Sequence, residues 1–135
     1  MRVVLDTNVV VSALISSAGP AGQVVRLVGR EKLIPLYDPR IWAEYEDVLS
    51  RPKFCFDHVD VKDVLGLIAA RGQRVEADPL PSRLPDPDDL PFLEVALSGR
   101  ARALITGNAR HFPRALMGAL KVLPPGEFLP WFARK

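Results

Sequence analysis

The amino terminus contains the feature that most restricts how this chain folds: a short apolar run that ends on an acid. The run Arg2–Leu5 is rich in β-branched residues, and Asp6 follows it directly. A continuous apolar run of this kind is typical of a strand buried on both faces, as in a parallel sheet. Thr7 or Asn8 then offers a side-chain cap for a helix over Val9–Ile15. We therefore expect Asp6 at the end of a buried strand, next to a helix start.

The rest of the chain alternates between helical and strand patterns. Apolar residues at helical spacing predict four more helices, over Ala21–Arg30, Ile41–Leu49, Val61–Arg71 and Leu90–Ser98. Short apolar runs predict four more strands, over Leu33–Tyr37, Gln73–Ala77, Ala103–Thr106 and Lys121–Leu123. This alternation predicts an α/β fold with a mostly parallel central sheet and helices on both faces.

Local signals set the expected boundaries of several elements. Asp38 followed by proline is a good helix start, and Asp60 is the expected cap of the helix Val61–Arg71. The stretch Asp78–Pro91 holds five prolines, so we expect a constrained loop there. The segment Glu127–Ala133 is expected to form a terminal turn of helix.

Length and composition predict one domain over residues 1–135, a size that can bury a hydrophobic core. The lone Cys55 excludes an internal disulfide framework and fits a reducing cytosol, so we expect a cytoplasmic protein. No apolar run approaches the roughly 18 residues of a membrane helix, and Asp6 interrupts the first run too early for a signal peptide. The net charge of +2 mildly favours an anionic partner and does not by itself indicate nucleic acid.

Acidic and polar residues follow the expected strand ends. Asp6 ends the first strand, Thr106 and Asn108 end a later one, and the acids Asp86, Asp88 and Asp89 precede a helix start. Ligands of parallel α/β sheets bind beyond the carboxyl ends of the strands. Carboxylate oxygens suit Mg²⁺ or Mn²⁺, and several acids near one another need a cation to relieve their repulsion. The pattern favours a metal site of the kind that phosphoryl chemistry uses.

Each of these residues also has a structural interpretation. From its position alone, Asp6 is as well explained by a helix cap as by a metal ligand. Glu44 shares its helix with Glu46 and Asp47, and by spacing alone Glu46 is an equally good candidate. The acids Asp86, Asp88 and Asp89 also fit a turn or a helix cap. For the two histidines, His58 and His111, we favour a structural role.

Four motifs in order give the chain a resemblance to the PIN-domain ribonucleases, including toxins of the VapC type. The run Val3–Asn8 resembles the first motif of that family, and Glu44 in Trp42–Phe54 looks like the second. The stretch Asp86–Leu97, with Asp89 before the helix, resembles the third. The fourth is matched by Leu104–Asn108 followed by His111 and Phe112. The match covers roughly residues 1 to 125.

The resemblance implies a Rossmann-like PIN fold of three layers and a metal-dependent endoribonuclease that cleaves single-stranded RNA with Mg²⁺ or Mn²⁺. It implies catalytic roles for Asp6, Glu44 and Asp89, and metal binding by Asp6, Glu44, Asp86 and Asp89. The side chains of Asn8, Thr106 and Asn108 are then expected to position water or substrate. Scattered basic residues would hold the RNA backbone: Arg2, Arg51, Lys53, Arg100, Arg110 and Arg114. The family also implies a cognate antitoxin protein and a homodimer.

One departure from the family pattern leaves alternatives open. Many members have an aspartate at the position of Asn108 or a few residues later, where this chain has Asn108 and His111. Asparagine brings no charge, so a second metal is expected to bind loosely unless Asp86 or Asp88 compensates. A non-cleaving RNA-binding or scaffold PIN domain is therefore the alternative. A phosphatase with Asp6 as phosphoryl acceptor is disfavoured, because the residue two positions later is Asn8 and not an acid.

Overall fold

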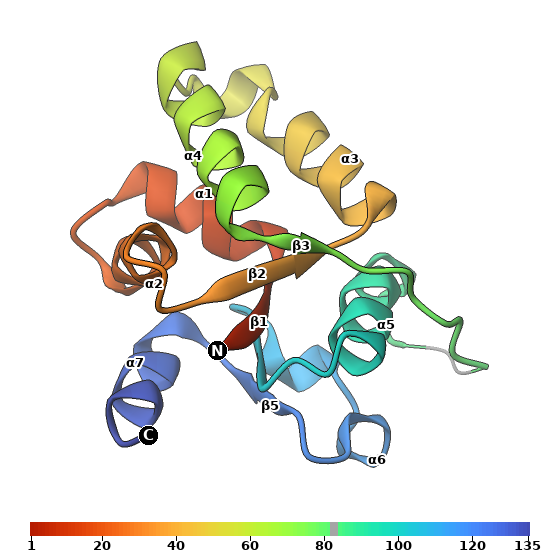
Figure 1. The fold of residues 1–135 in the computed structure, drawn as a ribbon. Helices are drawn as coiled ribbons and strands as arrows, with labels where there is room; N and C mark the ends of the chain where they lie inside the picture. The colour runs from red at the N-terminus through yellow and green to blue at the C-terminus, as the bar shows by residue number, and fades with distance from the viewer. Residues whose placement is uncertain (82–83) are drawn as a thin grey trace.

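Five parallel strands form the centre of the molecule, in the order β3-β2-β1-β4-β5. The computed structural model describes residues 1–81 and 84–135 (Figure 1). The strands are β1 (Arg2–Leu5), β2 (Ile34–Tyr37), β3 (Gln73–Arg74), β4 (Ala103–Ile105) and β5 (Lys121–Leu123). The helices are α1 (Thr7–Ile15), α2 (Pro20–Gly29), α3 (Pro39–Leu49), α4 (His58–Arg71), α5 (Leu90–Ser98), α6 (Arg114–Met117) and α7 (Pro125–Ala133). The expected α/β fold with a three-layer arrangement around a parallel sheet is confirmed.

The strand order reverses next to β1, and this reversal places the functional edge of the sheet. From β1 the chain moves outward to β2 and β3, then returns through α5 to β4 on the other side of β1. Helices α1, α3 and α4 lie on one side of β2, and α5 lies on the other (Figure 1). The connections that leave β1 and β4 therefore diverge to opposite faces. Such a switch point leaves a crevice at the carboxyl ends of the two strands, where α/β proteins bind ligands.

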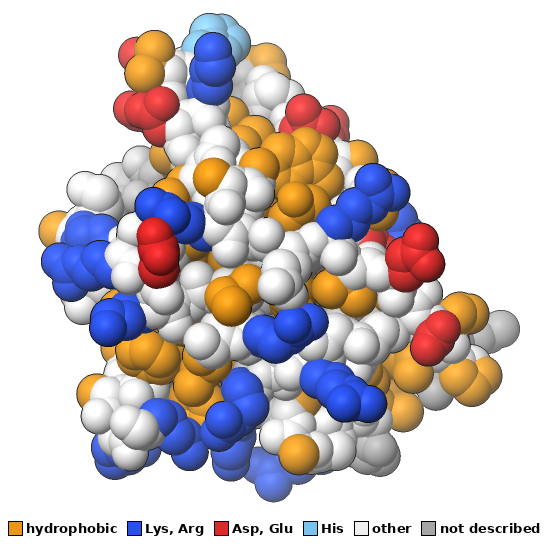
Figure 2. Space-filling view, viewed as in Figure 1, with side chains coloured by type: hydrophobic (Ala, Val, Ile, Leu, Met, Phe, Trp, Pro, Cys, Tyr) orange, Lys and Arg blue, Asp and Glu red, His pale blue; other side chains and the backbone are white. Residues whose placement is uncertain are grey.

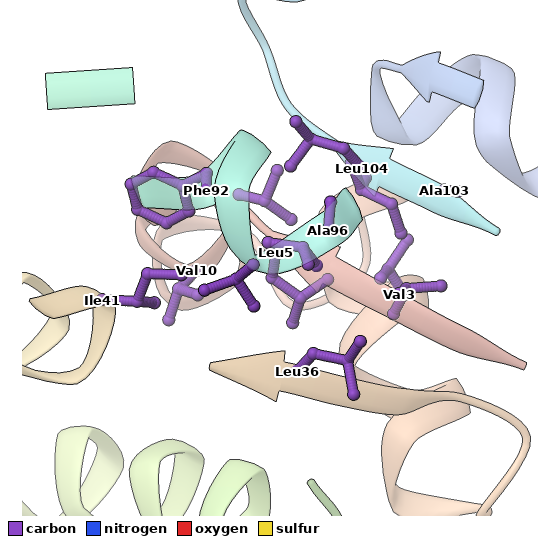
Figure 3. Packing of buried hydrophobic residues seen from close by; sticks show 14 of the residues in the cluster. Val3, Leu5, Val10, Leu36, Ile41, Phe92, Ala96, Ala103 and Leu104 are labelled. Atoms are coloured by element: carbon purple, nitrogen blue, oxygen red, sulfur yellow. The ribbon is translucent and has the colours of Figure 1, made fainter. Parts of the chain in front are cut away.

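The core consists of side chains from the central strands packed against helices on both faces. Val3, Val4 and Leu5 of β1 are 0% exposed, as expected for a strand with a helical layer on each side. Phe92 and Ala96 of α5 pack over β1 and β4 near Leu104, as Figure 3 shows. Burial of this apolar surface is the main favourable term in folding, at about 25 cal/mol per Å².

Helix α5 is buried around most of its circumference. The five consecutive residues Phe92–Ala96 are all buried, because the helix packs on β1, β2 and β4 at once. A helix with apolar residues all round is typical of such a central position. Its first turn therefore lies directly above the switch point, and Asp89 immediately precedes it.

Two expected boundaries are wrong, each for a local reason. Helix α4 begins at His58 and not at Val61, and its cap is Asp57, whose Oδ1 accepts from the Val59 amide at 2.7 Å. The sequence pattern does not reveal this first turn, because Val59 is 63% exposed and the apolar periodicity starts only later. Asp60 lies within that first turn, where an acid interacts favourably with the helix dipole.

The third strand is shorter than the expected Gln73–Ala77. Pairing with β2 covers Gln73 and Arg74, with one further bond from the Val75 amide to the Tyr37 carbonyl at 2.8 Å. Strand β2 ends at Tyr37 because Pro39 begins α3, so the edge strand has no partner beyond that point in the described part of the chain. Helix α6 is not predicted by the sequence pattern.

Within the described residues, no single helix has the length and apolar character to cross a membrane. Helices α1 and α2 meet that requirement only when taken together, and they meet at a bend of 102°.

Candidate functional site

Asp6 occupies the cap position of α1 but does not cap the helix with its side chain. Its Oδ2 atom accepts a hydrogen bond from the Thr106 hydroxyl at 2.7 Å and a longer one from the Asn8 amide nitrogen at 3.4 Å. The residue is only 5% exposed. The carboxylate is thus turned across the switch point toward β4, as a site residue would be. Thr7 and Asn8, the expected caps, are the first residues of the helix itself.

A chain of hydrogen bonds links the ends of β1 and β4 around Asp6. The Thr106 hydroxyl, which donates to Asp6, accepts from the Asn108 amide at 3.0 Å. The Gly107 amide donates to Asn8 Oδ1 at 3.0 Å, which fixes the orientation of the Asn8 side chain. Asn8 and Thr106 therefore position Asp6, whereas Asn108 contributes its backbone and is itself exposed.

Glu44 is brought to the same edge by α3. The Thr7 hydroxyl donates a hydrogen bond to Glu44 Oε2, which connects the start of α1 to α3. The neighbouring Tyr45 is 0% exposed, and its hydroxyl donates to the Leu5 carbonyl at 2.5 Å, directly before Asp6. Burial of Tyr45 therefore sets the rotation of α3 that turns Glu44 toward the end of β1.

Glu46, which the sequence could not distinguish from Glu44, lies elsewhere. It is exposed and lines a separate hollow of about 420 Å³ with Tyr37 and Trp42. Of the two glutamates, only Glu44 is joined to the β1–α1 junction within the described structure.

Asp89 approaches from the opposite face of the sheet. It ends the 3-10 turn Pro87–Asp89 just before α5 and is 7% exposed. Its Oδ2 atom is buried and has no hydrogen-bond partner among residues 1–81 and 84–135, and His111 Nδ1 lies 3.4 Å away. Asp86 is exposed and begins the same turn, with its Oδ1 accepting from the Asp88 amide at 2.9 Å.

Asp6 lies close enough to both Glu44 and Asp89 to perturb their pKa values. Burial raises the pKa of Asp6, and the Thr106 hydrogen bond only partly offsets it. Burial also raises the pKa of Glu44, with added repulsion from Asp6 and Asp88 and an opposing hydrogen bond from Thr7. Burial, followed by repulsion from Asp6 and Asp86, raises the pKa of Asp89 to about 6, despite the nearby His111. Raised pKa values of this origin mark a place where positive charge would be stabilised.

The donor chemistry of this edge fits a divalent ion, although the side chains are not arranged around one. Among residues 1–81 and 84–135, no three His, Cys, Asp or Glu side chains converge closely enough to hold a metal together. The buried Asp89 Oδ2 is nevertheless an available donor atom, and Asp6 and Glu44 supply further carboxylates whose mutual repulsion a cation would relieve. Binding would require small rotations of these side chains toward one another.

An ionic network joins α3 and α5, the two helices that flank the site. Arg40 of α3 contacts Glu94 Oε1 of α5 and Asp38 Oδ2, each at 2.7 Å. Glu94 Oε2 also accepts from the Leu80 amide at 2.7 Å, so the network includes the backbone of Leu80. Glu94 is 3% exposed, and burying a carboxylate at so little exposure requires such partners. The only sequence signal for this network is the acid Glu94 in the middle of an otherwise apolar helix.

The six basic residues expected to hold RNA lie in different parts of the structure. Arg110 and Arg114 line a hollow of about 740 Å³ beside β5, together with Lys121. Arg51 lowers the pKa of Glu44 from its position at the end of α3, and Lys53 follows it with its Nζ atom 5.0 Å from the Phe54 ring centroid.

Arg2 and Arg100 lie away from the site, and their expected contact with RNA stays a prediction. Both lie at the amino ends of strands, at the sheet edge opposite to the site, because Arg2 begins β1 and Arg100 precedes β4. Arg2 has a local role there: it donates to the Gly99 carbonyl and to Gln73 Oε1, each at 2.8 Å.

Comparisons with known proteins agree with this fold. A family model described as "PIN domain" matches residues 2–110. No curated protein matches the sequence. The fold is similar to that in the crystal structure of VapBC2 from Rickettsia felis bound to a DNA fragment from the promoter. The TM-score is 0.56 at 16% sequence identity, and the match covers 90% of this chain and 97% of that chain. The structure of PAE2754 from Pyrobaculum aerophilum gives a TM-score of 0.53 at 19% identity, covering 100% and 91%.

Proposed function

Because this chain belongs to the PIN domain family, we propose that it is a divalent-metal-dependent endoribonuclease that cleaves single-stranded RNA. The observation that carries the proposal is that Asp6, Glu44 and Asp89 lie at the carboxyl edge of the sheet and that each has a raised pKa. Partly buried carboxylates of this kind gain most from a bound dication, and hard oxygen donors favour Mg²⁺ or Mn²⁺.

The roles of the residues follow from their contacts. A bound dication supplies Lewis acidity toward a phosphate oxygen and lowers the pKa of water. Asp6 and Asp89 would hold it from opposite faces of the sheet, with Asp86 as a further acidic ligand. Thr7 holds one oxygen of Glu44, so the other oxygen of that carboxylate is presented to a ligand or to water. Asn8 and Thr106 keep Asp6 oriented, and Asn108, which is exposed, would contact the substrate.

The RNA backbone would follow the basic hollow next to the site. Arg110, Arg114 and Lys121 line it, and the 3-10 turn Ala109–His111 connects it to Asn108. Figure 2 shows further Lys and Arg side chains on the lower part of the face in view, which is the face that carries the amino terminus in Figure 1. Cationic side chains that contact phosphates provide affinity without reading the sequence, so binding would weaken steeply with salt.

The biological setting of the proposal is a toxin–antitoxin system. The chain would act in the cytoplasm as the toxin, paired with an antitoxin protein, and would form a homodimer. The fold shared with the VapBC2 structure supports a partner of this class. Co-purification with the product of a neighbouring gene, with light scattering for the subunit number, tests the pairing and the dimer.

The direct test is cleavage of a labelled single-stranded RNA in Mn²⁺ or Mg²⁺. Asp6→Asn keeps an oxygen that accepts from Thr106 but removes the charge, and it should lower the rate by at least about 100-fold, since it removes transition-state stabilisation. Glu44→Gln should also lower the rate strongly, whereas the exposed control Glu46→Gln should not. Activity in Asp6→Asn equal to that of the wild type would refute the proposal, as would the absence of any cleavage under broad conditions.

A non-cleaving RNA-binding domain is the second candidate. It is favoured by the lack of three converging ligands among the described residues and by the uncharged Asn108 in the fourth motif. RNA binding that persists in EDTA without any turnover would support it. Cleavage that depends on metal would exclude it.

A further inference from the structure

His111 and Asp89 form a close pair of polar side chains at the site. Asp89 Oδ2 and His111 Nδ1 are both buried atoms with no hydrogen-bond partner in the described part of the chain, and they lie 3.4 Å apart. Asp89 as a residue is only 7% exposed, and the His111 side chain is 45% exposed through the rest of its ring. The contact between the two atoms is long for a hydrogen bond, and a third species that binds both would satisfy them better.

The spacing of the pair fits two ligands of one metal ion. Atoms held at about 2.1 Å from a common ion are roughly 3.0 Å apart at a right angle and roughly 3.4 Å apart at a tetrahedral angle. The observed separation lies at the upper end of this range. A neutral imidazole has a lone pair on one nitrogen, so His111 Nδ1 can ligate when its proton is on Nε2.

The position of His111 in the fold supports this assignment. It ends the 3-10 turn that follows β4, on the same side of the switch point as Thr106 and Asn108. Its Nδ1 atom lies 3.4 Å from Asp89 Oδ2, and Thr106, which precedes the same turn, donates a hydrogen bond to Asp6. Asn108, the other polar candidate in this turn, is exposed and is an uncharged amide.

We propose that His111 is a metal ligand of this site, paired with Asp89, and that its imidazole makes the site select a first-row transition ion such as Mn²⁺ over Mg²⁺. Transition ions accept nitrogen ligands readily, while Mg²⁺ strongly prefers oxygen and near-ideal octahedral geometry. The inference rests on the proposed function for its biological meaning, but metal binding can be measured without RNA.

The test is pulsed electron paramagnetic resonance of the full-length protein loaded with Mn²⁺. Directly coordinated imidazole nitrogen produces a ¹⁴N modulation, which we expect in the wild type and not in His111→Asn. The chain has only one other histidine, so the exposed His58 provides a matched control: His58→Asn should retain the signal. Absence of the modulation from the wild type, or its persistence in His111→Asn, would overturn the assignment.

Calorimetric titration tests the selectivity. His111→Asn should weaken Mn²⁺ binding about tenfold or more, as loss of a supporting group at a metal site does, and should change Mg²⁺ binding by less than about threefold. His111→Asp should lower the ratio of Mn²⁺ affinity to Mg²⁺ affinity, since it replaces a nitrogen ligand with an oxygen ligand. Equal losses for both ions would contradict the selectivity.

The two proposals can fail separately in these experiments. If the nitrogen signal is present but no RNA is cut, the ligand assignment stands and the proposed function fails. If RNA is cut in a metal-dependent way but the wild type lacks the nitrogen signal, the proposed function stands and the ligand assignment fails.

Discussion

At the scale of single residues, the site depends on hydroxyl groups that hold carboxylates in place. Thr106 is 0% exposed and stands between the Asn108 amide and Asp6 Oδ2. The Thr7 hydroxyl likewise donates a hydrogen bond to Glu44 Oε2. In both cases, a short hydroxyl side chain orients a carboxylate at the carboxyl edge of the sheet.

Replacing one of these hydroxyls should loosen its carboxylate. Thr106→Val removes the donor to Asp6 and leaves the Asn108 amide without its acceptor, so the free energy of unfolding should fall by about 1–3 kcal/mol. RNA cleavage should fall as well, because Asp6 can then rotate. Denaturant titration and the cleavage assay measure the two effects. Wild-type activity in a variant that has lost this stability would show that Thr106 is merely structural.

The raised pKa of Asp89 makes the metal-free protein sensitive to pH. Its folded-state value of about 6 lies above the usual 3.8, so the folded state binds the proton more tightly than the unfolded state. The stability that this carboxyl contributes is complete below about pH 4 and is lost as the pH rises through 6. In EDTA, Asp89→Asn should therefore gain stability relative to the wild type between pH 5 and 7. A difference in melting temperature that stays constant over this range would contradict the assignment.

The sequence predicts some of these residues better than others, for physical reasons. Asp6 is identifiable because an acid at the end of an apolar strand has no place in a core. Glu44 requires the family resemblance, since nothing in helical spacing separates it from Glu46. Tyr45 and Thr7 look like ordinary helix residues in the sequence, because their hydrogen bonds reach partners nearly 40 positions away in the chain. The sequence favours a structural role for His111, and only the folded chain places it beside Asp89.

At the scale of secondary structure, two helices on opposite faces of the sheet position Glu44 and Asp89. Helix α3 presents Glu44 and α5 is preceded by Asp89, and Arg40 and Glu94 join the two helices. Glu94 also accepts from the Leu80 amide, so this ionic contact is joined to backbone outside the two helices.

Breaking this network should cost more than breaking an exposed ion pair. Glu94→Gln weakens a contact in which the carboxylate is buried and Arg40 is about half exposed, so we expect a loss of about 1–3 kcal/mol in the free energy of unfolding. The control is Asp47→Asn, which breaks the exposed pair with Arg51 and should cost less than about 1 kcal/mol. Urea denaturation of both variants decides the point, and equal costs would show that the Glu94 contacts add nothing.

Element boundaries are predictable where the local signal is strong. Asp38 begins α3 as expected, with its Oδ1 accepting from the Ile41 amide at 3.0 Å. The expected bounds of helix α4 and strand β3 are wrong because their ends depend on an exposed valine and on where β2 stops. Neither feature can be recognised from the segment itself.

At the scale of the whole molecule, the reversal of strand order creates the site. Residues more than 80 positions apart lie at one edge of the sheet, because β1 and β4 are neighbours. A ligand bound there joins both halves of the sheet.

Metal binding should therefore stabilise the whole fold. A ligand at 100 times its dissociation constant adds about 2.7 kcal/mol to the free energy of unfolding. We expect Mn²⁺ to raise the melting temperature at pH 8 and to do so much less at pH 5, since protons then compete for Asp89. Calorimetric scans at the two pH values test this expectation. An equal rise at both would place the ion away from these carboxylates.

The most direct test of the proposed metal site is a crystal soaked in Mn²⁺ and measured for anomalous scattering. We predict a peak at the carboxyl edge of β1 and β4, within about 2.0–2.6 Å of carboxylate oxygens from Asp6 and Asp89. A peak only at other surface acids, or none at this edge in soaked crystals, would contradict the claim that these residues form a metal-dependent site.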